Sequence, residues 1–174
     1  MQKQLSILCL LVSLVLTGCG KTVTAPDTDW QTLIHASQRE EIVQLLIEQE
    51  RWANLNHDDL KGPQDQSLGL AEALLNQEVL SSEVRLAGFV VPLEWHNQHV
   101  TEFLLVPYFG ACVHAPPPPA NQIVHVRLEE KHAIPFDIIR DAVWAEGLLE
   151  RFDGDFDEQG EVGYTLSSAK VSAY

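Results

Sequence analysis

The sequence predicts a mainly β protein whose C-terminal part forms a small, five-stranded, OB-like antiparallel barrel. Two observations support this fold class. Short β-rich runs recur at regular spacing from residue 83 to the end of the chain, and polar or glycine-containing turns separate several of them. Strands at this spacing close most readily into a small barrel, with a β-sandwich as the alternative.

The expected strands occupy the second half of the chain. Gly88 predicts a bulge or bend in the first of them, and residues 96–99 predict the turn of a hairpin between the first two. Residues 134–140 predict a short helical linker. The five strands are expected at 83–95, 100–109, 122–129, 143–152 and 161–174.

The segment before the strands is expected to be helical. Apolar residues from Asp29 to Trp52 fall in clusters one or two helical turns apart. Asp27 or Thr28 is placed to cap the start of this helix. The turn-rich residues 54–66 predict a loop, and residues 68–80 predict a second short helix.

The N-terminus carries the features of an exported lipoprotein. Lys3 precedes an apolar run at residues 5–16, which is shorter than the roughly 20 residues that span a bilayer. Residues 16–19, Leu-Thr-Gly-Cys, resemble the cleavage site of bacterial lipoproteins, in which Cys19 would carry diacylglycerol and an acyl chain such as palmitate. An ordinary secretory signal or an N-terminal anchor helix is the alternative. Gly20 favours the outer membrane over the inner membrane.

These features divide the chain and limit its partners. The formal net charge of −14 argues against nucleic acid and anionic headgroups as partners. Cleavage removes Cys9 and lipidation uses Cys19, so only Cys112 remains as a thiol and no internal disulfide is expected. The expected parts are a signal peptide (1–18), a lipid anchor and tether (19–28), a helical N-terminal segment (29–80) and the barrel domain (81–174).

The connection at residues 110–121 is the most distinctive part of the sequence. Its four prolines, Pro116–Pro119, favour an extended and stiff backbone. Cys112 and His114 lie just upstream and point to the same side of an extended chain. A thiolate and an imidazole make half of a zinc or copper(I) site. The imidazoles available to complete it are those of His96, His99, His125 and His132.

Three interpretations of Cys112 and His114 remain open: a packed thiol with a hydrogen-bonded histidine, a metal site, and a thiol activated by His114. The last needs a third, orienting group, which the sequence does not identify. Asn121 and Gln122 are expected to satisfy backbone groups beside the prolines. The segment from His96 to His99 predicts a polar turn more than a ligand pair.

Residues 84–89 (VRLAGF), residues 100–114 (VTEFLLVPYFGACVH) and the prolines followed by Asn121-Gln122 resemble one bacterial family. It comprises small secreted proteins catalogued as a domain of unknown function, with the signature G-x-C-[IV]-H-x-P-P-P-P-x-N-Q. The resemblance is strong over residues 84–128 and weak over 20–80. It implies an OB-like barrel and a periplasmic or lipoprotein location. Because some members resemble components encoded beside ABC-type transporters tied to zinc supply, it also implies a metal-handling role.

We therefore expect a lipid-anchored periplasmic accessory protein that handles zinc together with an ABC-type transport system, and binding is expected more than catalysis. The alternatives are a thiol-dependent enzyme or redox protein, and an envelope protein that docks through its polyproline loop. The residues expected to act are Cys112 and His114 as metal ligands, Cys19 as the lipid attachment site, and Pro116, Pro117, Pro118, Pro119, Asn121 and Gln122 as the loop-structuring or binding residues.

Overall fold

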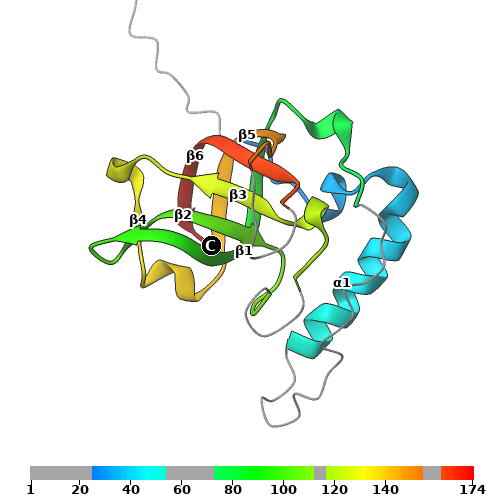
Figure 1. Cartoon of the computed structure of the whole chain (residues 1–174), viewed down its shortest axis with the longest axis horizontal. Coiled ribbons are helices and arrows are strands. Elements are labelled where there is room, and N and C mark those ends of the chain that lie inside the picture. Colours follow the sequence, from blue (N-terminus) through cyan, green and yellow to red (C-terminus); the bar gives the residue numbers. More distant parts are fainter. Residues whose placement is uncertain (1–24, 54–72, 112–116, 155–161) are drawn as a thin grey trace, which may run out of the picture.

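Six strands form one sheet in the order β1-β5-β6-β3-β2-β4, and an additional pairing of β1 with β2 closes five of them into a barrel (Figure 1). All strand pairs are antiparallel except β3 with β6, which run parallel. This computed structural model describes residues 25–53, 73–111, 117–154 and 162–174. The strands are β1 (Ser82–His96), β2 (His99–Val106), β3 (Val124–Arg127), β4 (Ile134–Pro135), β5 (Val143–Arg151) and β6 (Tyr164–Ala173).

The closed sheet confirms the predicted five-stranded OB-like barrel and excludes the sandwich alternative. Each predicted strand matches an observed one.

The predicted helical linker at residues 134–140 was wrong in its first part. There the short strand β4 pairs with the start of β2, and only Ile138–Arg140 form a 3-10 turn, η7.

Gly88 marks the corner at which β1 changes partner. The strand pairs with β5 from Ser82 to Gly88 and with β2 from Phe89 onward. A Cβ atom on Gly88 would lie 2.8 Å from the carbonyl oxygen of Val106, so only glycine lets the two strands approach this closely. The register shifts of β1 lie further on, beyond Pro92.

Alternate side chains of the strands fill the barrel. The interior is aliphatic and aromatic, and each fully buried large side chain contributes roughly 1.5–3 kcal/mol. Leu33 from the N-terminal segment completes this core, whose buried strand residues include Val84, Leu86, Phe103, Leu105, Val124, Val126, Leu149, Tyr164 and Leu166. A second, smaller cluster comprises Leu104, Val106, Tyr108, Ala111 and Ile123.

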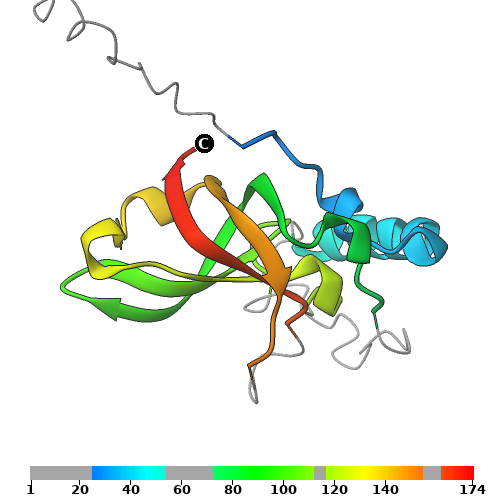
Figure 2. The ribbon, with the colours of Figure 1, turned by 90° about the horizontal axis from the view of Figure 1, so that it is seen from above.

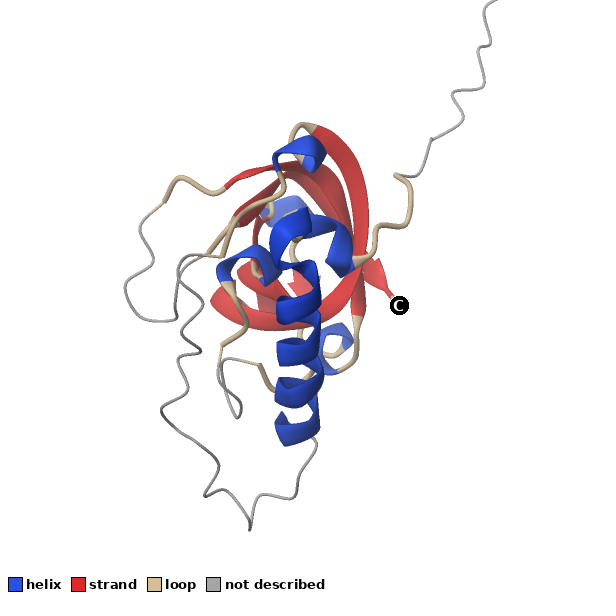
Figure 3. Cartoon of the chain, turned by 90° about the vertical axis from the view of Figure 1, so that its right-hand side faces the viewer, coloured by secondary structure: helices blue, strands red, loops and turns tan. Residues whose placement is uncertain are grey.

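The N-terminal segment lies at one end of the barrel, and the tip of the β1–β2 hairpin lies at the other (Figures 2 and 3). It consists of two 3-10 turns, η1 (Trp30–Leu33) and η2 (Ala36–Gln38), and the helix α1 (Arg39–Ala53). The Trp30 indole Nε1 donates to the Ala87 carbonyl at 2.6 Å, which ties η1 to the barrel.

The helix expected from Asp29 was wrong before Arg39, where α1 begins. Ile34 is extended and forms an isolated bridge with Leu75, and both Leu33 and Ile34 are fully buried. Burial of this segment against the barrel therefore outweighs its helical pattern. The cap is Asp29, which accepts a hydrogen bond from the Gln31 amide at 2.8 Å, and not Asp27 or Thr28.

Several expectations fall on parts of the chain beyond the described ranges. These are the signal peptide with Cys19, the loop at 54–66, and the residues Cys112, His114 and Pro116. The described part of the predicted helix at 68–80 holds only a 3-10 turn, η4 (Gln77–Val79). Within the described ranges, no helix has the length and apolar character needed to cross a membrane.

Candidate functional site

One buried side chain of α1 contacts both ends of the Cys112–His114 connection. The Gln49 Oε1 accepts a hydrogen bond from the Tyr108 hydroxyl at 3.0 Å. The Gln49 Nε2 donates to the Pro117 carbonyl at 3.3 Å. Gln49 and Tyr108 are each only 4% exposed, so water competes little for these bonds. The helix thus fixes the separation between the start and the return of the connection.

The connection leaves the barrel through Phe109 and Gly110. Gly110 has a φ of 81°, a left-handed conformation that glycine adopts without steric cost. The Phe109 ring is 60% exposed and meets the edge of the Phe89 ring at a centroid distance of 5.8 Å. A large aromatic side chain is therefore presented at the surface three residues before Cys112.

The connection returns through the prolines to a fully buried pair of amides. Pro117 is exposed and Pro118 is buried. Asn121 and Gln122 lie in the 3-10 turn η5 (Ala120–Gln122) and have no exposed surface. The Asn121 Nδ2 donates to the Leu74 carbonyl at 3.0 Å.

Gln122 completes the link between this turn and the N-terminal segment. Its Nε2 donates to the carbonyls of Trp30, at 3.1 Å, and Asn121, at 2.7 Å. The side-chain oxygens of Asn121 and Gln122 have no hydrogen-bond partner in the structure as described. These two amides fasten the N-terminal segment to the end of the proline run.

Tyr164 reinforces the same end of the barrel. Its hydroxyl donates to the Leu33 carbonyl and accepts from the Asn76 amide, both at 2.7 Å. Burial raises the pKa of Tyr164 to about 12, although the hydrogen bond from Asn76 acts in the opposite direction. The hydroxyl therefore stays protonated and keeps both bonds at physiological pH.

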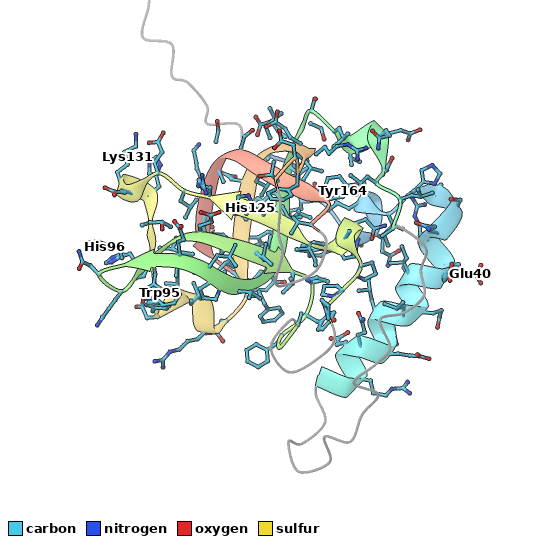
Figure 4. The ribbon with its side chains drawn as sticks, viewed as in Figure 1. Glu40, Trp95, His96, His125, Lys131 and Tyr164 are labelled. Atoms are coloured by element: carbon cyan, nitrogen blue, oxygen red, sulfur yellow. The ribbon has the colours of Figure 1, made fainter. Side chains whose placement is uncertain are left out.

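A network of polar and charged side chains lies on the outer face of β2, β3 and β6. Phe103 and Leu105 belong to the interior core, so Glu102 on the same strand faces outward. Glu102 is directly opposite Arg127, and His125 is directly opposite Thr165 of the parallel strand. Figure 4 shows His125 on β3, in the middle of the barrel wall.

The carboxylate of Glu102 joins this network. Its Oε1 lies 2.7 Å from the His125 Nε2, and its Oε2 accepts from the Arg127 Nη2 at 2.7 Å and Nε at 3.0 Å. Burial alone would raise the pKa of Glu102, but the hydrogen bonds from His125 and Arg127 outweigh burial and lower it. Glu102 is therefore an anion, and the His125 Nε2 carries the hydrogen that it accepts.

The other side of His125 is also occupied. Its Nδ1 lies 3.2 Å from the Thr165 Oγ1, and its ring is tilted against the Phe152 ring at a centroid distance of 5.0 Å.

The series Glu102–His125–Thr165 can hold and pass a proton. Because Arg127 remains 71% exposed, the network also presents a cation on the strand 2–3 face that OB-folds use for ligands.

This network was not predicted from the sequence. Glu102 and Arg127 come from different strands, so only the strand register brings them together. The sequence held one indication of this network. His125 and Arg127 are two residues apart on a predicted strand, and such residues share a face.

Among the imidazoles that were considered as further metal ligands, the structure places His125 apart from His96 and His99, which are cross-strand neighbours in the β1–β2 hairpin. His96 lies at the tip of the β1–β2 hairpin, at the opposite end of the barrel from α1 (Figure 4). His125 contacts Glu102 and Thr165 through its two ring nitrogens. Within the ranges that the structure covers, no group of three or more His, Cys, Asp or Glu side chains is arranged to hold a metal ion.

The fold and these contacts define a small OB-like barrel protein in which α1 holds Tyr108 and Pro117, on either side of residues 112–116, at one end of the barrel. Residues 30–173 match the family described as "Protein of unknown function (DUF3299)", and the chain belongs to that family. The chain is similar to a DUF3299 family protein from Pseudomonas aeruginosa PAO1 whose crystal structure is known. The TM-score is 0.58 at 28% identity, and the match covers 86% of this chain and 97% of that one. No curated protein matches the chain.

Proposed function

We propose that this protein is a lipid-anchored binding protein of the bacterial periplasm that uses Cys112 and His114 to hold zinc for a transport system. The observation that carries the proposal is the double hydrogen bond of Gln49 to Tyr108 and Pro117. A loop fixed at both ends before it binds loses little conformational entropy on binding.

The chemistry of the two side chains selects the ion. A thiolate with an imidazole suits zinc or copper(I), whereas magnesium and calcium require oxygen ligands. The chain has a formal net charge of −14, which attracts cations. Two protein ligands leave coordination positions open for water or for a partner's side chain. An open site of this kind suits delivery of the ion better than structural binding.

The short link between the barrel and the proposed lipid anchor supports a role at a membrane. Pro26 and Thr28 are hydrogen-bonded to Arg85 of β1, so the chain joins the barrel at Pro26. Only about seven residues then separate a lipid on Cys19 from the barrel, and an extended chain of that length spans at most roughly 25 Å. In this proposal the barrel works close to the membrane, within reach of an ABC-type transporter.

Zinc binding by the mature, reduced protein tests the proposal. Equilibrium dialysis should show stoichiometric zinc in the wild type and loss of zinc in Cys112→Ser and in His114→Ala. Gln49→Leu should keep both ligands but weaken the affinity by up to about thirtyfold, since roughly 1 kcal/mol is lost with each of its two hydrogen bonds. Gln44→Leu is the matched control, because Gln44 is exposed on the same helix, and it should bind as the wild type does.

Each alternative function has its own outcome. A wild-type protein without zinc above background would refute the metal site. A Cys112 thiol that alkylates with a pKa well below the ordinary value of about 8.5 would then support a thiol-dependent enzyme or redox protein. An unactivated thiol, together with partner capture lost when the four prolines are replaced, would support docking through the loop.

A further inference from the structure

The tip of the β1–β2 hairpin presents two histidines side by side. His96 and His99 are direct cross-strand partners and close a two-residue turn. Asn97 and Gln98 in that turn both have positive φ, 48° and 64°, as the type I′ hairpin requires. Cβ atoms of directly opposed residues lie roughly 4.5–5.5 Å apart and on one face of the sheet. Both imidazoles can therefore reach the same point.

A hydrogen bond fixes the ring of His99 for metal binding. Its Nδ1 lies 2.9 Å from the Asn97 carbonyl oxygen. A carbonyl oxygen only accepts hydrogen bonds, so the Nδ1 carries the hydrogen and the neutral ring has its lone pair on Nε2. Metal-ligating histidines show the same arrangement, in which one nitrogen donates to a carbonyl and the other binds the ion.

The hairpin tip is braced by the segment that follows β3. The Phe136 amide donates to the Gln98 carbonyl at 3.1 Å, and His99 pairs with Pro135 of β4. The Trp95 and Phe136 rings meet edge to face at a centroid distance of 6.1 Å. Because the turn is held by these contacts, the two histidines are positioned before an ion binds.

We infer that His96 and His99 form a two-imidazole site for a borderline divalent cation, with copper(II) bound most tightly. Imidazole suits copper, nickel and zinc, and copper(II) leads the affinity order of the divalent first-row metals. Both histidines are exposed, so the ion keeps further positions for water. This site lies at the opposite end of the barrel from α1 (Figures 1 and 4) and does not depend on Cys112 or His114.

The test uses the full mature chain carrying Cys112→Ser and His114→Ala, which removes the loop ligands. Copper(II) sulfate is titrated in the presence of glycine as a weak competitor, and binding is followed by calorimetry and electron paramagnetic resonance. We expect one bound copper(II) with nitrogen couplings from both imidazoles. His96→Ala and His99→Ala should each lose the calorimetric binding and the two-nitrogen spectrum while keeping the circular dichroism of the parent.

His35→Gln is the matched control, because His35 lies at the α1 end of the barrel and a glutamine can still accept from the Ser37 amide. It should bind copper(II) as the parent does. Failure of the parent to bind copper(II), or unchanged binding in either His96→Ala or His99→Ala, would overturn the inference. Neither result would test zinc binding by Cys112 and His114, because both residues are already replaced in the parent protein of this experiment.

Discussion

Glu102 illustrates how a single residue can organise one face of the barrel. Its carboxylate is almost fully buried, and its two oxygens are occupied by His125 and Arg127. A buried carboxylate is stable only when hydrogen bonds and opposite charges replace water. The three side chains therefore act as a unit, and the loss of either His125 or Arg127 removes a hydrogen bond from the Glu102 carboxylate.

Glu102→Gln should destabilise the protein by about 1.5–3 kcal/mol at neutral pH, the range for hydrogen bonds to charged groups. The folded state lowers the pKa of Glu102 below its ordinary value of 4.5. Its stabilising effect is therefore present above that value and lost as the pH falls through the lower, folded-state pKa. Urea denaturation of both proteins across this range should show the difference shrinking as the solution becomes acidic.

Glu129→Gln is the matched control for that measurement. The hydrogen bond from Lys131 lowers the pKa of Glu129 as well, but both side chains are about 70% exposed. Exposed ion pairs contribute little to stability, so this variant should unfold like the wild type. A Glu102→Gln protein that was equally unaffected would show that the buried network does not stabilise the barrel.

Among the elements, the strands were predicted well and the N-terminal segment less well. The β-rich run at residues 83–95 could be predicted as a strand because its composition suits a half-buried surface, and buried residues alternate in its first half, at Val84, Leu86 and Gly88. Ile34 and His35 interrupt the expected helix because their backbone contacts residues 74 and 75, far along the chain. A local sequence pattern does not predict a contact between residues so far apart in the chain.

The candidate site, like the fold, was predicted only in part from the sequence. The loop with its prolines, Asn121 and Gln122 could be identified because its composition is unusual for a connection between strands. Gln49 could not, since a polar residue on a helix is ordinarily exposed and only the fold places it against Tyr108 and Pro117. The charged network on the outer face depends in the same way on strand register.

Gly163, immediately before β6, should be intolerant of substitution. A Cβ atom there would lie 2.5 Å from the Ala120 carbonyl oxygen and 2.7 Å from the Leu75 Cδ2. Gly163→Ala should therefore push β6 away from η5 and cost about 1–3 kcal/mol, measurable as a lower urea midpoint. In Gly154→Ala the contact is with the Phe152 ring, which can rotate, so a smaller loss is expected. Equal losses would contradict this account.

For the whole molecule, membrane anchoring gives the broadest prediction. Cells expressing the full chain should incorporate labelled palmitate into the protein, and Cys19→Ser should abolish the label, because Cys19 is the proposed attachment site. Cys9→Ser and Cys112→Ser are matched controls and should keep the label. Labelling that persisted in Cys19→Ser, or disappeared in Cys112→Ser, would contradict the proposed anchor.

The parallel pairing of β3 with β6 has a consequence for the order in which the protein folds. β6 is the last strand in the sequence, and it bonds β5 on one side and β3 on the other. Until residues 164–173 are available, β3 and β5 each lack a partner and the ring of strands stays open. A chain that emerges with its N-terminus first therefore completes its barrel only after residues 164–173 have appeared. Folding is then a single late event, dominated by contacts between distant parts of the chain.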